Sequence, residues 1–305
     1  MLTEQQRLNN LSVPNYPIDV VLDTDAFNEI DDQFAISYLL KNQQKLCVKG
    51  FCAAPFLNEK SVSAADGMEK SYQEILKLLA LAGEERFNSL VFRGSEEYLP
   101  DEQTPVDSDA ALFMAELSKG YTPEKPLYVV AIGAITNVAS ALLMEPDMKD
   151  RVVIVWLGGN GWHMKDNYEF NLRQDVAAAR VVFGCGAPVV QLPCAGVVDH
   201  FTVSRYELEH WLCGKNALCD YLAQNTIREA ESYAAGKPWT RVIWDVTAIG
   251  WLLNEGGRFM ETQLLPSPIP QYDHRYSFDP TRHRIGVVTA IRRDALLENL
   301  IASLT

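Results

Sequence analysis

Five acidic side chains are concentrated in one short stretch near the beginning of the chain, LDTDAFNEIDDQF. They are Asp23, Asp25, Glu29, Asp31 and Asp32, and no lysine or arginine follows before Lys41. Because carboxylates held close together repel one another, a bound cation is the simplest way to bring them into one site. Oxygen ligands without histidine or cysteine favour Ca²⁺ or Mg²⁺ over zinc. The alternative is that one or two of these acids cap a helix and the others are solvated.

The residues around these acids indicate how they are positioned. The short aliphatic run before Asp23 predicts a buried strand, so that Asp23 and Asp25 fall at the end of it. Side chains alternate along an extended chain, and these two carboxylates therefore share one face while Thr24 points the other way. Apolar residues then recur at helical spacing, which places Asp31 and Asp32 in the first turn of a helix. The stretch is predicted to be a strand-to-helix connection crowded with carboxylates.

This connection resembles the N-terminal signature of the inosine/uridine-preferring nucleoside hydrolases. In that family an Asp-x-Asp at a strand end is followed closely by Asp-Asp and a helix. One departure concerns the loop. Five residues, AFNEI, separate Asp25 from Asp31, where the family usually has three that begin with Pro-Gly. The loop is therefore two residues longer than in the usual pattern.

Three later segments resemble the family's other motifs, in the family's order. In the turn IGAITN the matching position is Ile132, whose backbone carbonyl is implied to reach the metal. The segment EFN matches the family's Glu-Phe-Asn, which implies that Glu169 and Asn171 hold ribose hydroxyls, together with Asn160 in the preceding glycine-rich loop. Asp245 corresponds to the aspartate that completes the calcium site. Without the family, the polar EFN segment would more often be a helix cap than a catalytic segment.

The resemblance implies a calcium-dependent hydrolase that splits ribonucleosides into ribose and a free purine or pyrimidine base. In the implied mechanism a metal-bound water attacks the anomeric carbon through an oxocarbenium-like transition state. Asp25 would bind the ion and the water and act as the general base. The implied metal ligands are Asp25, Asp32, Asp245 and the Ile132 carbonyl. The implied substrate-binding residues are Asp31, Asn58, Asn160, Glu169, Asn171 and Trp244.

The expected role of Asp23 differs from those of the residues above, and Asn58 has two interpretations. Asp23 is expected to support the loop by accepting hydrogen bonds rather than to bind the ion itself. Asn58 follows a second predicted strand, where its amide could bind a sugar or a base. An ordinary turn residue before a helix is an equally good interpretation of Asn58.

The position before Asp245 departs from the family. Trp244 stands where the family has a proton-donating histidine, and Val246 stands where it has proline. An indole does not titrate near neutrality, so the leaving base must be activated in another way. In one hypothesis Trp244 stacks on the base, with Trp162 among the aromatic residues that could help. In the other hypothesis His163 supplies the proton.

The order of the predicted elements indicates an α/β fold. Strands are expected at residues 18–22, 46–54, 90–92, 127–132 and 152–157. One helix is expected to begin near residue 30, and a separate long helix is expected to end near residue 82. Two further helices are expected at residues 109–118 and 136–144. This rhythm favours a doubly wound, mostly parallel sheet with helices on both faces, which is a Rossmann-like core. We expect a single nucleoside hydrolase-like domain over residues 1–305.

Composition limits the partners and the compartment. A net charge of −13 over 305 residues argues against a nucleic-acid partner, because such binding depends on lysine and arginine. No apolar run is long enough to span a membrane, and the N-terminal residues lack a basic-then-apolar signal, so a cytoplasmic location is expected. The six cysteines form no Cys-x-x-Cys pair and are expected to be reduced. Members of the resembled family are commonly dimers or tetramers, which implies a homo-oligomer.

Two other functions are compatible with parts of this pattern. A phosphatase of the haloacid dehalogenase type also has Asp-x-Asp after its first strand. Its usual Thr or Val is replaced here by Phe27, and Asp31 and Asp32 would have no task. A riboside-binding protein without turnover is the non-enzymatic alternative, and the missing histidine at Trp244 motivates it. Release of phosphate, or binding without release of base, would distinguish these alternatives.

Overall fold

The computed structural model describes residues 2–305 and is built on an eight-stranded sheet. The strands, in the order in which they lie side by side, are β3 (Val91–Arg93), β2 (Leu46–Ala53), β1 (Ile18–Thr24), β4 (Leu127–Ala131), β5 (Val152–Leu157), β6 (Val189–Leu192), β12 (Arg284–Ile291) and β9 (Met260–Pro266). Neighbouring strands are parallel except for β9, which pairs with β12 in the antiparallel sense. The expected mostly parallel sheet is confirmed.

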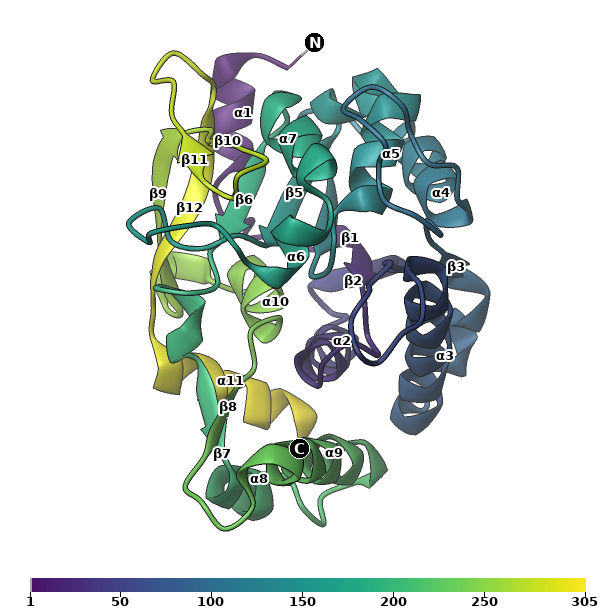
Figure 1. The fold of residues 1–305 in the computed structure, drawn as a ribbon, viewed down its shortest axis with the longest axis vertical. Coiled ribbons are helices and arrows are strands. Elements are labelled where there is room, and N and C mark those ends of the chain that lie inside the picture. The colour runs from purple at the N-terminus through teal and green to yellow at the C-terminus, as the bar shows by residue number, and fades with distance from the viewer. Residues whose placement is uncertain (1) are drawn as a thin grey trace.

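Helices cover both faces of this sheet (Figure 1). One face carries α2 (Asp31–Lys41), α3 (Ala64–Ala82), α10 (Val246–Leu252) and α11 (Arg293–Leu304), which share one hydrophobic cluster. The opposite face carries α4 (Asp109–Ser118), α5 (Thr136–Met144) and α7 (Val176–Gly184), which share a second cluster. Alternation along β1 explains the division, because Val20 and Leu22 belong to the first cluster and Val21 to the second. A sheet buried on both faces therefore has continuous apolar strands.

The remaining elements lie around this core. They are α1 (Glu4–Asn10), α6 (Phe170–Gln174), β7 (Thr202–Ser204), α8 (Arg205–Trp211), α9 (Ala217–Ala234), β8 (Thr240–Val242), β10 (Ile269–Pro270) and β11 (Tyr276–Ser277). Strands β7 and β8 pair with each other, as do β10 and β11. Within the described part of the chain, no helix is both long enough and apolar enough to cross a membrane.

The direction in which the chain adds strands reverses beside β1. From β1 the chain proceeds to β2 and β3 on one side, and then returns to place β4, β5 and β6 on the other side. The loops that follow β1 and β4 consequently diverge at this point, which leaves a crevice at the carboxyl ends of the two strands. Open α/β sheets bind their ligands in this kind of crevice.

A buried asparagine ties the end of β1 to its neighbours. The Asn137 side chain, at the start of α5, donates hydrogen bonds to Asp23 Oδ1 at 2.7 Å and to the Ala53 carbonyl at 3.1 Å. Its own oxygen accepts from the Ser95 backbone N–H at 2.7 Å and from the Ser95 hydroxyl at 2.9 Å. One amide thus joins α5, β1, β2 and the segment after β3. These contacts agree with a supporting role for Asp23.

We expect Asn137→Ala to lower the free energy of unfolding by about 2–4 kcal/mol, because it leaves several buried polar groups without partners. Urea denaturation measures this change. Asn88→Ala is the control, since Asn88 is exposed and its removal should change stability by less than about 0.5 kcal/mol. Equal stabilities for the two variants would contradict the role given to the Asn137 contacts.

Candidate active site

A cavity of about 220 Å³ opens at the carboxyl ends of the central strands. The loops that follow β1, β4, β5 and β6 all contribute to its lining. Nine residues singled out from the sequence line it, namely Asp25, Asp31, Asp32, Ile132, Asn160, Glu169, Asn171, Trp244 and Asp245. Side chains more than two hundred positions apart in the sequence therefore share one cavity at the switch point of the sheet.

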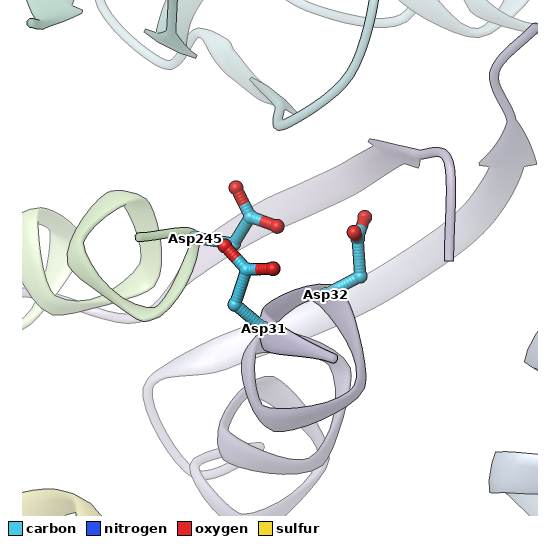
Figure 2. Close-up of side chains that lie close together, drawn as sticks. All are labelled: Asp31, Asp32 and Asp245. Carbon is cyan, nitrogen blue, oxygen red and sulfur yellow. The ribbon is translucent and has the colours of Figure 1, made fainter. Parts of the chain in front are cut away.

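Three aspartates converge at one side of the cavity (Figure 2). Asp31 and Asp32 are the first two residues of α2, and Asp245 immediately precedes α10. One carboxylate oxygen from each lies within 4.8 Å of the others, and all three side chains are buried. The Thr24 hydroxyl, at the end of β1, donates a hydrogen bond to Asp32. The ends of two helices and one strand thus place these carboxylates together.

Burial and mutual repulsion both disfavour the charged form of these acids. Burial raises the pKa of Asp25 well above its ordinary value, and the charges of Asp32 and Asp31 raise it further. Burial also raises the pKa of Asp31 and of Asp245, with added contributions from neighbouring carboxylates. Burial raises the pKa of Asp32 to about 7, although the hydrogen bond from Thr24 opposes the shift. The Arg241 guanidinium opposes the shift in the pKa of Asp31, but without further positive charge these carboxyls cannot all ionise near neutral pH.

The same cluster has the properties of a site for a hard divalent cation. Asp25 Oδ2 and Asp31 Oδ1 are buried and have no hydrogen-bond partner among the described residues. The Ile132 carbonyl, which also lines the cavity, accepts a hydrogen bond from Asn171 at 3.1 Å and keeps a second lone pair. None of the described side chains that line the cavity is lysine or arginine. An all-oxygen donor set with unsatisfied carboxylates fits Ca²⁺ or Mg²⁺.

The other side of the cavity is lined by amides and one further carboxylate. Glu169 precedes α6 and accepts backbone N–H groups from Asn171 at 2.8 Å, Leu172 at 2.9 Å and Gly159 at 2.8 Å. Burial raises the pKa of Glu169, and these three hydrogen bonds oppose the shift. Glu169 is therefore a helix cap and also a lining residue of the cavity, and its role in holding ribose hydroxyls stays a prediction.

Three residues considered from the sequence lie outside the cavity lining. Asn58 donates through Nδ2 to the Asn28 side chain at 2.7 Å. His163 is exposed, and Trp162 donates to Gln191 at 2.9 Å while its ring packs beside Phe278. Trp244, in contrast, is half-buried and lines the cavity. Of the three residues considered for activation of the leaving base, Trp244 lines the cavity, and Trp162 and His163 do not.

The sequence reasoning gave no individual role to six lining residues, namely Asn28, Glu29, Leu157, Phe170, Cys194 and Ala195. Of these, Glu29 was named only as one of the clustered acids. Asn28 and Glu29 belong to the longer loop between the paired aspartates, so the two extra residues were a usable signal. Cys194 follows β6, a strand that the sequence analysis did not predict. Its position would have been suggested by the rule that site residues follow strand ends.

The model of the inosine-uridine preferring nucleoside hydrolase family matches residues 20–290 of the chain. The chain belongs to this family. The curated relatives it resembles include a probable uridine nucleosidase 2 of Arabidopsis thaliana, 30% identical over 134 residues, which are 39% of this chain and 41% of that protein. Another is the inosine-uridine preferring nucleoside hydrolase of Leishmania major, 35% identical over 94 residues, which are 30% of each protein. The matched segments thus span less than half of these relatives.

Solved structures of nucleoside hydrolases share the fold over nearly the whole chain. A purine-preferring ribonucleoside hydrolase from Gardnerella vaginalis superposes with a TM-score of 0.74 at 20% identity and covers 94% of this chain and 98% of its own. A plant nucleoside hydrolase gives a TM-score of 0.73 at 21% identity and covers 95% and 99%. The type III effector XopQ, complexed with adenosine diphosphate ribose, gives 0.66 at 16% identity and covers 100% and 98%. At sequence identities this low, the superpositions show a common fold and no more.

We expect Ca²⁺ to raise the melting temperature of chelator-treated protein, and to raise it more at pH 8 than at pH 5. Cation binding requires ionised carboxylates, and because the pKa of Asp32 is about 7, protons compete strongly at pH 5. At a free Ca²⁺ concentration of one hundred times Kd the stabilisation is about 2.7 kcal/mol. Differential scanning calorimetry measures both effects.

The chelated protein should show the opposite pH dependence. A carboxyl whose pKa is raised on folding holds more protons in the folded than in the unfolded protein, so stability falls as the pH rises from about 4 to about 7. Asp245→Asn should remove the response to Ca²⁺, whereas Asp273→Asn, at an exposed position, should keep it. A wild-type melting temperature that ignores Ca²⁺ at pH 8 would argue against the site.

Proposed function

We propose that this nucleoside hydrolase family member catalyses calcium-dependent hydrolysis of the N-glycosidic bond of ribonucleosides. The products are ribose and a free purine or pyrimidine base. The observation that carries the proposal is the shared cavity, in which a buried cluster of aspartates faces the polar groups of the EFN segment. The first group of residues suits a cation and a water molecule, and the second suits the hydroxyls of a sugar.

Asp25 is the proposed general base. It lines the cavity, it is buried, and its Oδ2 has no partner among the described residues. Burial raises its pKa, which brings its basicity closer to that of an effective catalyst near neutral pH. Asp25 accepts one proton from a water molecule as the water oxygen bonds to the anomeric carbon. The bond from that carbon to the base breaks, and its electron pair leaves with the base, which takes a proton from solvent at a ring nitrogen.

Asp25, Asp32, Asp245 and the Ile132 carbonyl are the proposed ligands of the cation. When bound, the cation supplies positive charge that offsets the carboxylates and makes a nearby water molecule more acidic. The carboxylates that surround the anomeric carbon also stabilise positive charge that develops on the sugar in an oxocarbenium-like transition state.

The ribose is held by groups that still have hydrogen-bonding capacity. Both amide hydrogens of Asn171 are donated, to the carbonyls of Ile132 and Leu157, so Asn171 offers its oxygen to a sugar hydroxyl. The Glu169 carboxylate lines the cavity too, but it already accepts three backbone N–H groups and interacts with the Cys194 thiol, so Asn171 and Asp31 offer the freer acceptors. Asp31 has a free buried oxygen. These acceptors suit the hydroxyl donors of a ribose.

Trp244 is the proposed contact for the leaving base. Its indole ring lines the cavity and offers a flat apolar face to a planar heterocycle. Stacking of this kind accepts purines and pyrimidines alike, because every base has a planar face. The absence of a titrating group at this position favours a second candidate function, which is riboside binding without turnover. Base release, followed by ultraviolet absorbance with inosine and uridine, distinguishes the two functions.

Oligomeric state and cellular location are also part of the proposed function. We propose a cytoplasmic homo-oligomer, as members of this family commonly form dimers or tetramers. Light scattering coupled to gel filtration tests the oligomeric state. The phosphatase alternative leaves the Asp31, Asp32 and Asp245 cluster without a task, and phosphate release from sugar phosphates tests it.

We expect Asp25→Asn to lower kcat by at least about 10²–10⁴, because it removes the proton acceptor and weakens the cation site. Asp23→Asn is the matched variant, and it should mainly lower thermal stability, since Asp23 contacts Asn137 and does not line the cavity. Reducing-sugar assays with inosine give the rates, and circular dichroism checks folding. Full activity in a folded Asp25→Asn protein would refute the assignment.

Substitutions at Trp244 and His163 separate the two accounts of base activation. Stacking predicts that Trp244→Ala lowers kcat/KM by about 10-fold or more and that Trp244→Phe keeps much of the activity. His163→Ala should change kcat/KM by less than about 3-fold, because general acid catalysis worth about 10²–10⁴ cannot come from a side chain outside the site. A large loss in His163→Ala, with loss of the alkaline limb of the pH–rate profile, would reverse this conclusion.

A further inference from the structure

The longer loop between β1 and α2 brings an additional amide into the cavity. Asn28 lies in this loop, lines the cavity and is only 6% exposed. Its backbone is held on both sides, because its N–H donates to the Asp25 carbonyl at 2.7 Å and its carbonyl accepts from Lys60 Nζ at 2.6 Å. The two contacts fix the position of the Asn28 side chain at the wall of the cavity.

Hydrogen bonds from the neighbouring loop also fix which way the Asn28 amide faces. The backbone N–H of Lys60 donates to Asn58 Oδ1 at 2.9 Å, and since a backbone N–H can only donate, this contact orients the Asn58 amide. Asn58 must then present Nδ2 to Asn28, and it donates to Asn28 Oδ1 at 2.7 Å. Asn28 Nδ2 is left as a donor that makes no hydrogen bond to the described residues.

Free donors are scarce in this cavity, whereas acceptors are abundant. Carboxylates dominate the lining, and both amide hydrogens of Asn171 are already donated. Asn160 donates one of its two amide hydrogens to the Asp166 carbonyl, at 3.3 Å. A sugar hydroxyl that donates to a carboxylate still has lone pairs on its oxygen, and these need a donor or a cation when the sugar is buried. Asn28 Nδ2 is suited to this need.

We propose that Asn28 donates a hydrogen bond through Nδ2 to the 2′- or 3′-hydroxyl of the ribose, and that it thereby selects ribosides over the corresponding deoxyribosides. Asn58 and Lys60 are positioning residues that hold Asn28 in the donating orientation. Asn58 was expected from the sequence to contact the substrate itself, and in this proposal it acts through Asn28. The inference rests on the proposed function, because it assumes that a riboside occupies the cavity.

The test pairs changes in the enzyme with changes in the substrate. The kcat/KM values of wild type and Asn28→Ala are compared on inosine, 2′-deoxyinosine, 3′-deoxyinosine and 5′-deoxyinosine, with Ca²⁺ present. We expect Asn28→Ala to lose about 3- to 10-fold on inosine and 5′-deoxyinosine, the range for one neutral hydrogen bond. On the analogue that lacks the contacted 2′- or 3′-hydroxyl, the loss should be less than 2-fold, roughly within the error of such assays.

Two further variants separate the donor itself from the structure around it. Asn58→Ala should reproduce the same substrate pattern with a smaller loss, because Asn28 keeps its amide but is free to rotate. Asn225→Ala should lose nothing on any substrate, since Asn225 is a half-buried amide that contacts Gln33 outside this cavity. Equal losses on all four nucleosides, or no loss on inosine, would overturn the proposal.

A binding measurement separates failure of this inference from failure of the proposed function. If the wild type releases no base from any nucleoside, calorimetry with D-ribose, 2-deoxy-D-ribose and 3-deoxy-D-ribose takes the place of kinetics. Weaker binding of ribose by Asn28→Ala, without a change for one deoxy sugar, supports the role of Asn28 while refuting turnover. Hydrolysis by the wild type with no substrate-dependent effect of Asn28→Ala refutes the inference alone. Absence of both hydrolysis and sugar binding refutes both.

Discussion

The structure depends on keeping several carboxylates dehydrated and close together at the end of β1. Isolated carboxylates are costly to bury, and their repulsion adds to that cost. The chain offsets part of it with local polar groups, such as the Thr24 hydroxyl at Asp32 and the Asn137 amide at Asp23. The N-terminus of α2 offers a further modest attraction for Asp31 and Asp32. A divalent cation can supply what remains, so the way in which the site is buried makes it suited to such an ion.

The topology of the sheet explains why this arrangement is possible. Reversal of strand order beside β1 opens a crevice between the loops after β1 and β4, and the loops after β5 and β6 complete its wall. Each loop brings a different chemistry to the crevice, with acids from the first, a carbonyl from the second and amides from the third. The strands themselves are buried on both faces and contribute rigidity. Reactive groups can therefore sit on loops without losing their relative positions.

Local features were predictable from the sequence and distant pairings were not. The helix at Thr136–Met144 and the strand at Val152–Leu157 have the bounds that apolar periodicity indicates, because their burial depends on neighbours in sequence. Asn58 and Asn28 are thirty positions apart, and only the packing of their two loops decides which amide reaches the cavity. Strand β9 was not predicted from the sequence, because most of its side chains are exposed at the edge of the sheet. Its weak apolar pattern carried little signal.

The distance along the chain between the clustered aspartates has a consequence for how the protein matures. Asp31 and Asp32 belong to the first helix after β1, whereas Asp245 follows β6, α8 and α9. Their oxygens can meet only once the chain extends to Asp245, so a shorter chain offers only the acids near its beginning. A cation held by the full set would join segments roughly two hundred residues apart, and because the unfolded chain lacks the assembled site, it would stabilise the folded chain by mass action. The cation site is therefore complete only when segments from both halves of the sequence have come together.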